Sequence, residues 1–208
     1  RAMMRRRYRR ALASLAFAAG IASAAAADFT PLPQLERVMV TAPKPISDSQ
    51  LTDDDGRPFK LSSLQGQPSL IFFGFAHCPD VCPAALQKLS VMRKTAPKEL
   101  AKVRVVMISV DGDRDTPESM RAYLARYSPD FIGLVGPPAD VRKIADELSA
   151  SFFKGPVRDS QGSYTIVHTS RLYALDRKGR LRAELYDASV ENTASVVRAL
   201  LAEAPIPQ

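Results

Sequence analysis

The hydrophobic residues of this chain fall into short continuous runs that alternate with amphipathic stretches. Residues 70–75 are apolar and aromatic, and residues 103–110 are rich in β-branched side chains, so we predict two buried strands covered on both faces. Residues 51–59 place acidic residues and glycine between apolar positions, which predicts a β-hairpin. Shorter runs predict four more strands, the last two joined by a tight turn, at residues 131–135, 164–167, 171–176 and 180–185.

Amphipathic stretches between and after these runs predict the helices. Pro83 opens one helix-forming segment, because proline is favoured at the first position of a helix. Thr116 is a typical N-cap and Pro117 a typical first residue, so a second helix is predicted from there to about residue 127. Apolar residues at helical spacing predict two further helices, at residues 141–151 and 190–203.

The order of these predicted elements indicates the fold class. After the hairpin at residues 51–59, the chain runs strand, helix, strand, helix, strand, helix, the short strand at 164–167, two further strands and a helix. Strands that alternate with helices favour a sheet with helices packed on its faces. We therefore predict an α/β fold, a thioredoxin-like sandwich with an N-terminal β-hairpin extension and an inserted helix.

The first 27 residues have the layout of a secretory signal. Residues 1–10 are basic, residues 11–22 are apolar and residues 23–27 are small, ahead of Asp28. The apolar run is alanine-rich and shorter than the roughly 20 residues of a membrane span, so we expect cleavage, with retention as an inner-membrane anchor as the alternative. The predicted destination is the periplasm, where a dithiol must be actively kept reduced to bind a metal.

The rest of the chain has the composition of one globular domain. Prolines within residues 28–47 prevent a regular helix, so we predict an extended lead-in to a single domain at residues 48–208. Six of the 29 basic residues lie within residues 1–10, and the other 23 nearly balance the 22 acidic residues. A nearly neutral body has no electrostatic footprint for nucleic acid, which excludes that class of partner. We expect a monomer.

Residues 72–83 contain both cysteines of the chain, Cys78 and Cys82, and one of its two histidines. The cysteines lie where a predicted strand leads into a helix, and their spacing brings them about one helical turn apart. They can therefore share a metal or, with some backbone adjustment, form a disulfide. The helix N-terminus favours thiolates, so we expect both sulfurs to be more nucleophilic than usual. The alternative is a pair of buried cysteines or a small structural disulfide.

Two acidic clusters raise the question of a hard cation site. The run at residues 53–55 is similar to a calcium loop but lacks the later ligands, so we interpret it as a solvated turn. Residues 111–115 hold three aspartates around Arg114, and we favour a self-paired loop over a cation site. This loop follows a central strand, at the edge of the sheet where α/β proteins place their sites.

Several motifs in order resemble the Sco/SenC family of copper proteins. They are Cys-Pro-Asp-Val-Cys-Pro at residues 78–83, Ser-Val-Asp at 109–111, Asp-Thr-Pro-Glu at 115–118, a distant His168, and Gly-Arg at 179–180. The resemblance covers about residues 51–201. The chain departs from the family at Ala76-His77, where a threonine is common, and at Val167, where an aspartate is frequent. The second departure bears on the orientation and basicity of the His168 imidazole.

The resemblance implies that Cys78, Cys82 and His168 bind copper. Two thiolates and one imidazole suit three-coordinate Cu(I) and, with an added weak ligand, Cu(II). His77 adjoins Cys78, but its side chain is expected to point away from that of Cys78, so at most it supports the site from outside the ligand set. Zinc is the alternative metal, although a closed structural zinc site needs a fourth protein ligand.

The implied function is that of a metallochaperone, which delivers copper to the dicopper site of cytochrome c oxidase subunit II. Such a carrier also needs a thiol reductant as a partner, to keep Cys78 and Cys82 reduced. The alternative is a periplasmic thiol–disulfide oxidoreductase that uses the two cysteines as a redox-active dithiol. His168 favours the carrier, because disulfide exchange does not require it. A peroxidase of the same fold is disfavoured, since Phe75 stands where a threonine is expected.

Overall fold

The computed structural model describes residues 31–36, 38–79, 81–95, 100–157, 163–186 and 189–203. The predicted signal at residues 1–27 lies outside these ranges. Within the described ranges, no helix has the length and apolar character needed to cross a membrane.

Eight strands form one mixed sheet in the order β1-β10-β9-β4-β5-β6-β2-β3. The predicted hairpin of residues 51–59 is β2 and β3, which extend the sheet beyond β6 and confirm the N-terminal extension. The strands of the sheet are β1 (Val38–Pro45), β2 (Gln50–Asp53), β3 (Pro58–Lys60), β4 (Ser69–Gly74), β5 (Arg104–Ser109), β6 (Ile132–Val135), β9 (Arg171–Leu175) and β10 (Arg180–Tyr186).

Strands β4, β5 and β6 are the parallel centre of the sheet. Ile71 pairs with Val106, and Val106 with Ile132, so the three strands end at the same edge. Every residue of β4 is buried, as its apolar sequence predicts for a strand covered on both faces. The segment that carries the cysteines follows β4, and the 111–115 loop follows β5. The sheet therefore brings these two segments together at its carboxyl edge.

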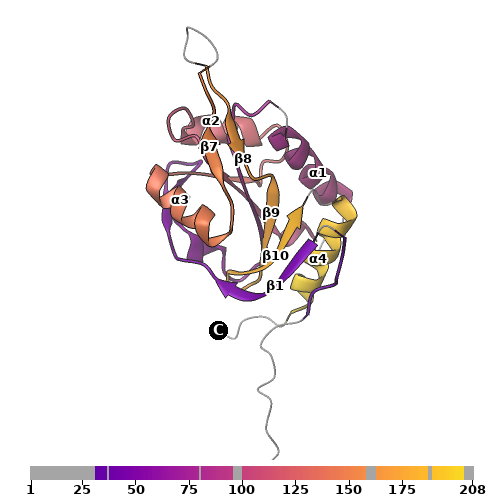
Figure 1. The fold of residues 1–208 in the computed structure, drawn as a ribbon. Helices are drawn as coiled ribbons and strands as arrows, with labels where there is room; N and C mark the ends of the chain where they lie inside the picture. Colours follow the sequence, from indigo (N-terminus) through magenta and orange to yellow (C-terminus); the bar gives the residue numbers. More distant parts are fainter. Residues whose placement is uncertain are drawn as a thin grey trace, which may run out of the picture.

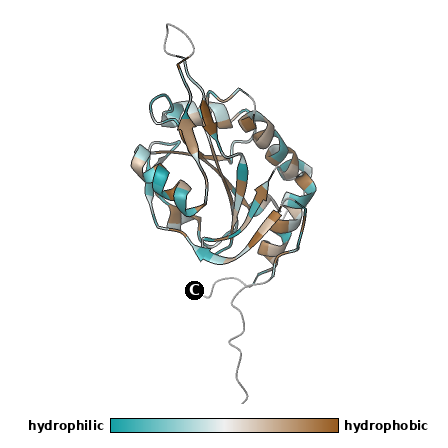
Figure 2. Ribbon diagram, viewed as in Figure 1, coloured by the Kyte–Doolittle hydropathy of each residue, from teal (hydrophilic) through white to brown (hydrophobic). Residues whose placement is uncertain are grey.

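The helices connect the strands and cover the sheet. They are α1 (Val81–Thr95), α2 (Pro117–Leu124), α3 (Pro138–Glu147) and α4 (Val190–Ala202), with short 3-10 turns η1 (Leu61–Leu64) and η2 (Leu100–Lys102). Helices α1 and α4 lie side by side, and α3 lies on the other side of the view (Figure 1). Hydrophobic and hydrophilic segments occur on the same helices, as expected for amphipathic helices (Figure 2). This arrangement is the predicted thioredoxin-like α/β sandwich.

The boundaries of three helices differ from the sequence predictions. Helix α2 ends at Leu124, three residues before the predicted end near residue 127. Helix α1 begins at Val81, not at Pro83, so Cys82 already lies in the first helical turn. Proline is tolerated there because the first N–H groups of a helix lack intrahelical partners. Helix α3 begins at Pro138, another proline in a first turn, and stops four residues short of the predicted residue 151. It stops because Ser149 adopts a left-handed backbone, with a φ of 55°.

Two strands were not predicted. Strand β1 lies in the segment expected to be an extended lead-in, and it pairs antiparallel with β10. Its prolines are tolerated because the strand is at the edge of the sheet, and the pairing is irregular between Val40 and Lys44. Strand β7 (Phe152–Lys154) pairs with β8 (Ile166–His168) in a separate two-stranded sheet. The two strands project together from the main body (Figure 1).

A buried arginine lies among the core residues on strand β10. The side chain of Arg182, on β10, is fully buried. It forms ion pairs with Asp176, at 3.7 Å, and with Glu203, which follows α4. A buried charge is tolerated only when it is paired in this way. These ion pairs connect the last strand of the sheet to the C-terminal helix.

Candidate metal centre

The two cysteines lie at the junction of β4 and α1. Cys78 is in the connecting segment, where its N–H donates to the carbonyl of Phe75 at 3.1 Å. Cys82 is the second residue of α1. Neither is part of a disulfide, and their residues are only 7% and 0% exposed. The sulfurs are therefore enclosed in the protein, with Cys78 closer to the surface.

His168 comes from the far end of the sequence and completes the group. It is the last residue of β8, and its Nε2 lies 3.5 Å from Cys82 Sγ and 4.0 Å from Cys78 Sγ. Its Nδ1 lies 3.2 Å from the carbonyl oxygen of Thr169. Because a carbonyl only accepts, Nδ1 must carry the proton, which leaves the Nε2 lone pair of the neutral imidazole directed at the sulfurs. This is the tautomer that binding of a metal through Nε2 requires.

The departure at Val167 does not leave the imidazole without an orienting partner. Val167 pairs with Phe153 across the hairpin, and its side chain is 49% exposed. The backbone carbonyl of Thr169 takes the orienting role on Nδ1. The ring of Phe75 also meets the His168 ring edge to face, with centroids 5.9 Å apart. One hydrogen bond and one aromatic contact therefore hold the ring.

One expectation about the thiols is wrong. The helix N-terminus was expected to activate both sulfurs, but the pKa of Cys82 is raised. The main causes are a hydrogen bond with Cys78, which the protonated thiol donates, and burial, which disfavours the thiolate. In the metal-free protein Cys82 is therefore held as a thiol. A metal that binds both sulfurs must displace this proton.

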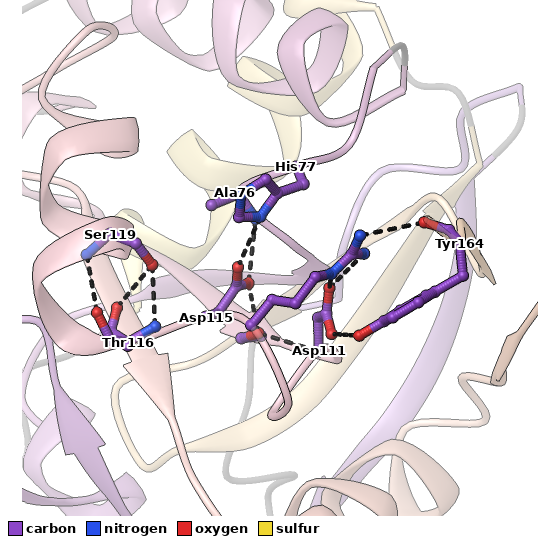
Figure 3. A network of polar contacts seen from close by, with 9 residues as sticks. Ala76, His77, Asp111, Asp115, Thr116, Ser119 and Tyr164 are labelled. Atoms are coloured by element: carbon purple, nitrogen blue, oxygen red, sulfur yellow. Dashed lines mark hydrogen bonds and ion pairs between the residues drawn. The ribbon is translucent and has the colours of Figure 1, made fainter. Parts of the chain in front are cut away.

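The side chain of His77 lies next to the carboxylate of Asp115 (Figure 3). Its Nδ1 lies 3.5 Å from Asp115 Oδ1, and its side chain is 55% exposed whereas that of Asp115 is fully buried. The other oxygen of Asp115 accepts hydrogen bonds from the N–H of Ala76 at 3.0 Å and from Ser109 Oγ at 2.7 Å. Asp115 therefore anchors the cysteine segment to the end of β5. The sequence did not indicate this role, although Asp115 is the first residue of the Asp-Thr-Pro-Glu motif at residues 115–118.

The 111–115 loop pairs its charges internally and with the neighbouring hairpin. Asp111 Oδ2 accepts from Arg114 Nε at 2.5 Å, and Asp113 pairs with Lys154 at 3.0 Å. This pairing is what the interpretation as a self-paired loop predicted. Asp111, Asp115 and His77 do lie close enough to hold an ion, but Asp111 already accepts hydrogen bonds on both oxygens. The cysteine and histidine group is the better candidate for a metal.

The donor set of that group favours a soft metal. The Sγ atoms of Cys78 and Cys82 and one ring nitrogen of His168 all lie within 4.8 Å of one another. Two thiolates and one imidazole match the preference of Cu(I) for soft ligands and low coordination number. A closed structural zinc site would need a fourth protein ligand. The three donors thus suit a soft metal and leave it able to accept one more ligand.

Comparison with known proteins gives the family. The SCO1/SenC family model matches residues 41–202, which include every element from β2 to α4. The chain belongs to the SCO1/SenC family. The match also includes Cys78, Cys82 and His168. It begins ten residues before the resemblance noted from the sequence, which covers residues 51–201.

Similar proteins come from bacteria of several groups. A SCO2-like protein of Rickettsia conorii is 32% identical over 139 residues, which cover 67% of this chain and 68% of the relative. The structure of Bradyrhizobium japonicum ScoI with copper bound has a TM-score of 0.66 and 37% identity, and covers 78% of this chain and 99% of that one. Apo Sco1 of Thermus thermophilus has a TM-score of 0.65 and 33% identity, with coverages of 83% and 96%.

Proposed function

We propose that this protein is a copper metallochaperone that binds copper through Cys78, Cys82 and His168. The observation that carries the proposal is the convergence of two sulfurs and an unprotonated imidazole nitrogen from segments about 90 residues apart. The donor set fits Cu(I), and the same set with one added ligand fits Cu(II). Support also comes from the copper-bound structure of Bradyrhizobium japonicum ScoI, at 37% identity.

The arrangement supports capture and release of the ion by ligand exchange. Cys82 is fully buried and held by α1, whereas Cys78 lies in the connecting segment and His168 on the separate hairpin. Copper is the cargo, and its capture releases the thiol protons. A three-coordinate ion can then accept a cysteine of another protein before it leaves its own ligands.

The proposed acceptor is the dicopper site of cytochrome c oxidase subunit II. This assignment rests on the family and on the soft donor set, which matches a copper-binding acceptor. We place the protein in the periplasm, to which the signal predicted at residues 1–27 exports it. The signal is then either cleaved or retained as an anchor in the inner membrane. A thiol reductant keeps the two cysteines reduced there, because the compartment is oxidising. The copper-binding domain is proposed to act as a monomer.

Copper transfer tests this proposal directly. The Cu(I)-loaded protein is mixed without oxygen with the reduced soluble domain of oxidase subunit II, and the copper content of both proteins is measured after separation. We expect copper to move to the acceptor from the wild-type protein. Copper that stays with the donor, or that reaches the acceptor equally fast from a small-molecule copper complex, would contradict the carrier role.

The second candidate is reduction of acceptor disulfides. It is favoured by the hydrogen bond between Cys82 and Cys78, which keeps a protonated resolving thiol next to a more accessible sulfur. Attack by the Cys78 thiolate on an acceptor disulfide would form a mixed disulfide and release one acceptor thiolate, which takes up the proton of Cys82. The Cys82 thiolate would then displace the second acceptor thiol, leaving a Cys78–Cys82 disulfide in this protein. The rate at which the wild-type protein and the His168→Ala variant reduce an oxidised acceptor peptide separates the two roles. Because disulfide exchange does not require the imidazole, a reductase should keep its rate in the variant.

A further inference from the structure

A single loop contacts both halves of the candidate metal centre. On the cysteine side, Asp115 accepts the N–H of Ala76 at 3.0 Å, two residues before Cys78. On the histidine side, Asp111 accepts the Tyr164 hydroxyl at 2.6 Å, four residues before His168 (Figure 3). The ligands come from distant parts of the sequence. The 111–115 loop is therefore a physical connection between them.

The contacts on the histidine side form a compact group, here called the clamp and consisting of Asp111, Arg114 and Tyr164. Arg114 Nε donates to Asp111 at 2.5 Å, and Arg114 Nη1 donates to the backbone carbonyl of Tyr164 at 3.1 Å. The guanidinium carbon also lies 3.8 Å from the centroid of the Tyr164 ring. Tyr164 is thus held at its hydroxyl, its ring and its carbonyl.

The hairpin that carries His168 depends on such contacts. Strands β7 and β8 pair in a two-stranded sheet that is separate from the main sheet. A two-stranded hairpin is at best marginally stable by itself, so side-chain contacts must fix its position. The pair of Lys154 and Asp113 also connects the hairpin to the loop, but their side chains are 50% and 68% exposed. Exposed pairs contribute little, whereas the Asp111 side chain in the clamp is 1% exposed.

Tyr164 is a dependable donor in this group. Burial, together with the hydrogen bond to Asp111 and the charge of that carboxylate, raises the pKa of Tyr164 to about 12. The phenol is therefore protonated near neutral pH. A substitution with phenylalanine removes the hydroxyl and keeps the ring over which Arg114 lies.

We propose that the clamp of Asp111, Arg114 and Tyr164 positions His168 against the two sulfurs and so determines how strongly the imidazole contributes to copper binding. Tyr164 and Arg114 are positioning residues in this proposal, because they act through His168. The proposal rests on the proposed function. Partners that orient a metal ligand typically affect metal affinity by about 10- to 100-fold.

A double-mutant cycle tests whether the clamp acts through His168. Anaerobic Cu(I) affinity is measured for the wild-type protein, Tyr164→Phe, His168→Ala and the double variant. We expect Tyr164→Phe to weaken binding about tenfold in the wild-type background and to have no further effect when His168 is absent. Tyr186→Phe is the matched control, since its hydroxyl donates to a carboxylate elsewhere, Glu184 at 3.3 Å. It should leave the affinity unchanged.

A second measurement reads the position of the His168 ring without a metal. The chain has two histidines, and the Phe75 ring lies 5.9 Å from that of His168, so its ring current shifts the His168 imidazole signals in the NMR spectrum. Tyr164→Phe should move these signals toward the values of an exposed histidine, and Tyr186→Phe should not. A variant that only lowers overall stability would leave the signals of the folded state in place.

The outcomes separate the clamp from the proposed function. The clamp proposal would be overturned if Tyr164→Phe changed the Cu(I) affinity equally with and without His168. It would also be overturned if Tyr164→Phe changed neither the affinity nor the His168 signals. In both cases tight binding by the wild-type protein would still support the carrier function. A wild-type protein whose Cu(I) binding is indifferent to Cys78→Ser and His168→Ala would overturn the proposed function. In that case, unchanged His168 signals in Tyr164→Phe would overturn the clamp as well, and shifted signals would support its positioning role.

Discussion

A methyl group added at Gly74 would clash with one of the two sulfurs of the candidate metal centre. Gly74 is the last residue of β4, and a Cβ built on it would lie 2.7 Å from Cys82 Sγ and 2.9 Å from Met107 Cε. The end of the Met107 side chain can swing away. Cys82 cannot do so easily, because it is fully buried in the first turn of α1. The substitution Gly74→Ala therefore moves the sulfur or the helix that carries it.

The size of the effect follows from these contacts. Non-bonded carbon atoms are most favourable at about 3.5–4.0 Å, so the contact with Cys82 must open by about 1 Å. Overpacking of this kind typically costs about 1–3 kcal/mol. The displaced sulfur lies 3.5 Å from Nε2 of His168, so the ligand set is disturbed together with the core. We expect Cu(I) affinity to fall by about tenfold, at the lower end of the range for disturbed metal ligation.

Two measurements and one control test this reasoning. Chemical denaturation of the metal-free protein gives the free energy of unfolding, and anaerobic chelator competition gives the Cu(I) affinity. Gly112→Ala is the matched control, because the nearest atom to its Cβ would be the carbonyl oxygen of Gly136 at 3.6 Å, an ordinary contact. It should be close to neutral in both assays. A Gly74→Ala protein with wild-type stability and wild-type affinity would refute the argument.

Three further substitutions test other parts of the fold. Arg182→Ala should lower the free energy of unfolding by about 3–5 kcal/mol in a urea titration, because it leaves the Glu203 carboxylate without its buried partner; a loss under 1 kcal/mol would contradict this. Burial raises the pKa of Glu147, but two hydrogen bonds from Ser47 and the charges of Lys143 and Lys44 together outweigh it and lower the pKa, so the charged form stabilises the folded state. Glu147→Gln should therefore cost about 1 kcal/mol near neutral pH, and the difference should shrink as the pH falls below 4.5, as thermal melts over pH would show; a difference independent of pH would count against it. Thr116→Ala removes the N-cap of α2 and should cost about 1 kcal/mol, measured by the shift of the denaturation midpoint.

The elements with strong local signals could be predicted from the sequence. Strands β4 and β5 are continuous apolar runs, and Thr116-Pro117 is a start signal that α2 follows. Strand β1 could not be found in this way, because its prolines argue against regular structure and its pairing with β10 is a contact between distant residues. Strand β7 has only three residues, too few for a periodic signal.

The candidate ligands of the metal centre could be identified from motifs, but the environment of their side chains could not. The cysteine spacing and the family resemblance identified Cys78, Cys82 and His168, which the structure brings together. The raised pKa of Cys82 depends on burial and on a neighbouring sulfur, and neither is visible in a local pattern. The contact of Tyr164 with Asp111 likewise joins residues 53 positions apart. Such contacts are a consequence of the tertiary fold.

The most direct test of the central claim is an anaerobic Cu(I) competition against a chromophoric chelator. The reduced wild-type protein is compared with Cys78→Ser, Cys82→Ser and His168→Ala, and the thiol content of each sample is measured. We predict tight one-to-one binding that is lost in either serine variant and markedly weakened in His168→Ala. Weak wild-type binding that does not depend on His168, together with rapid dithiol exchange, would contradict a copper carrier.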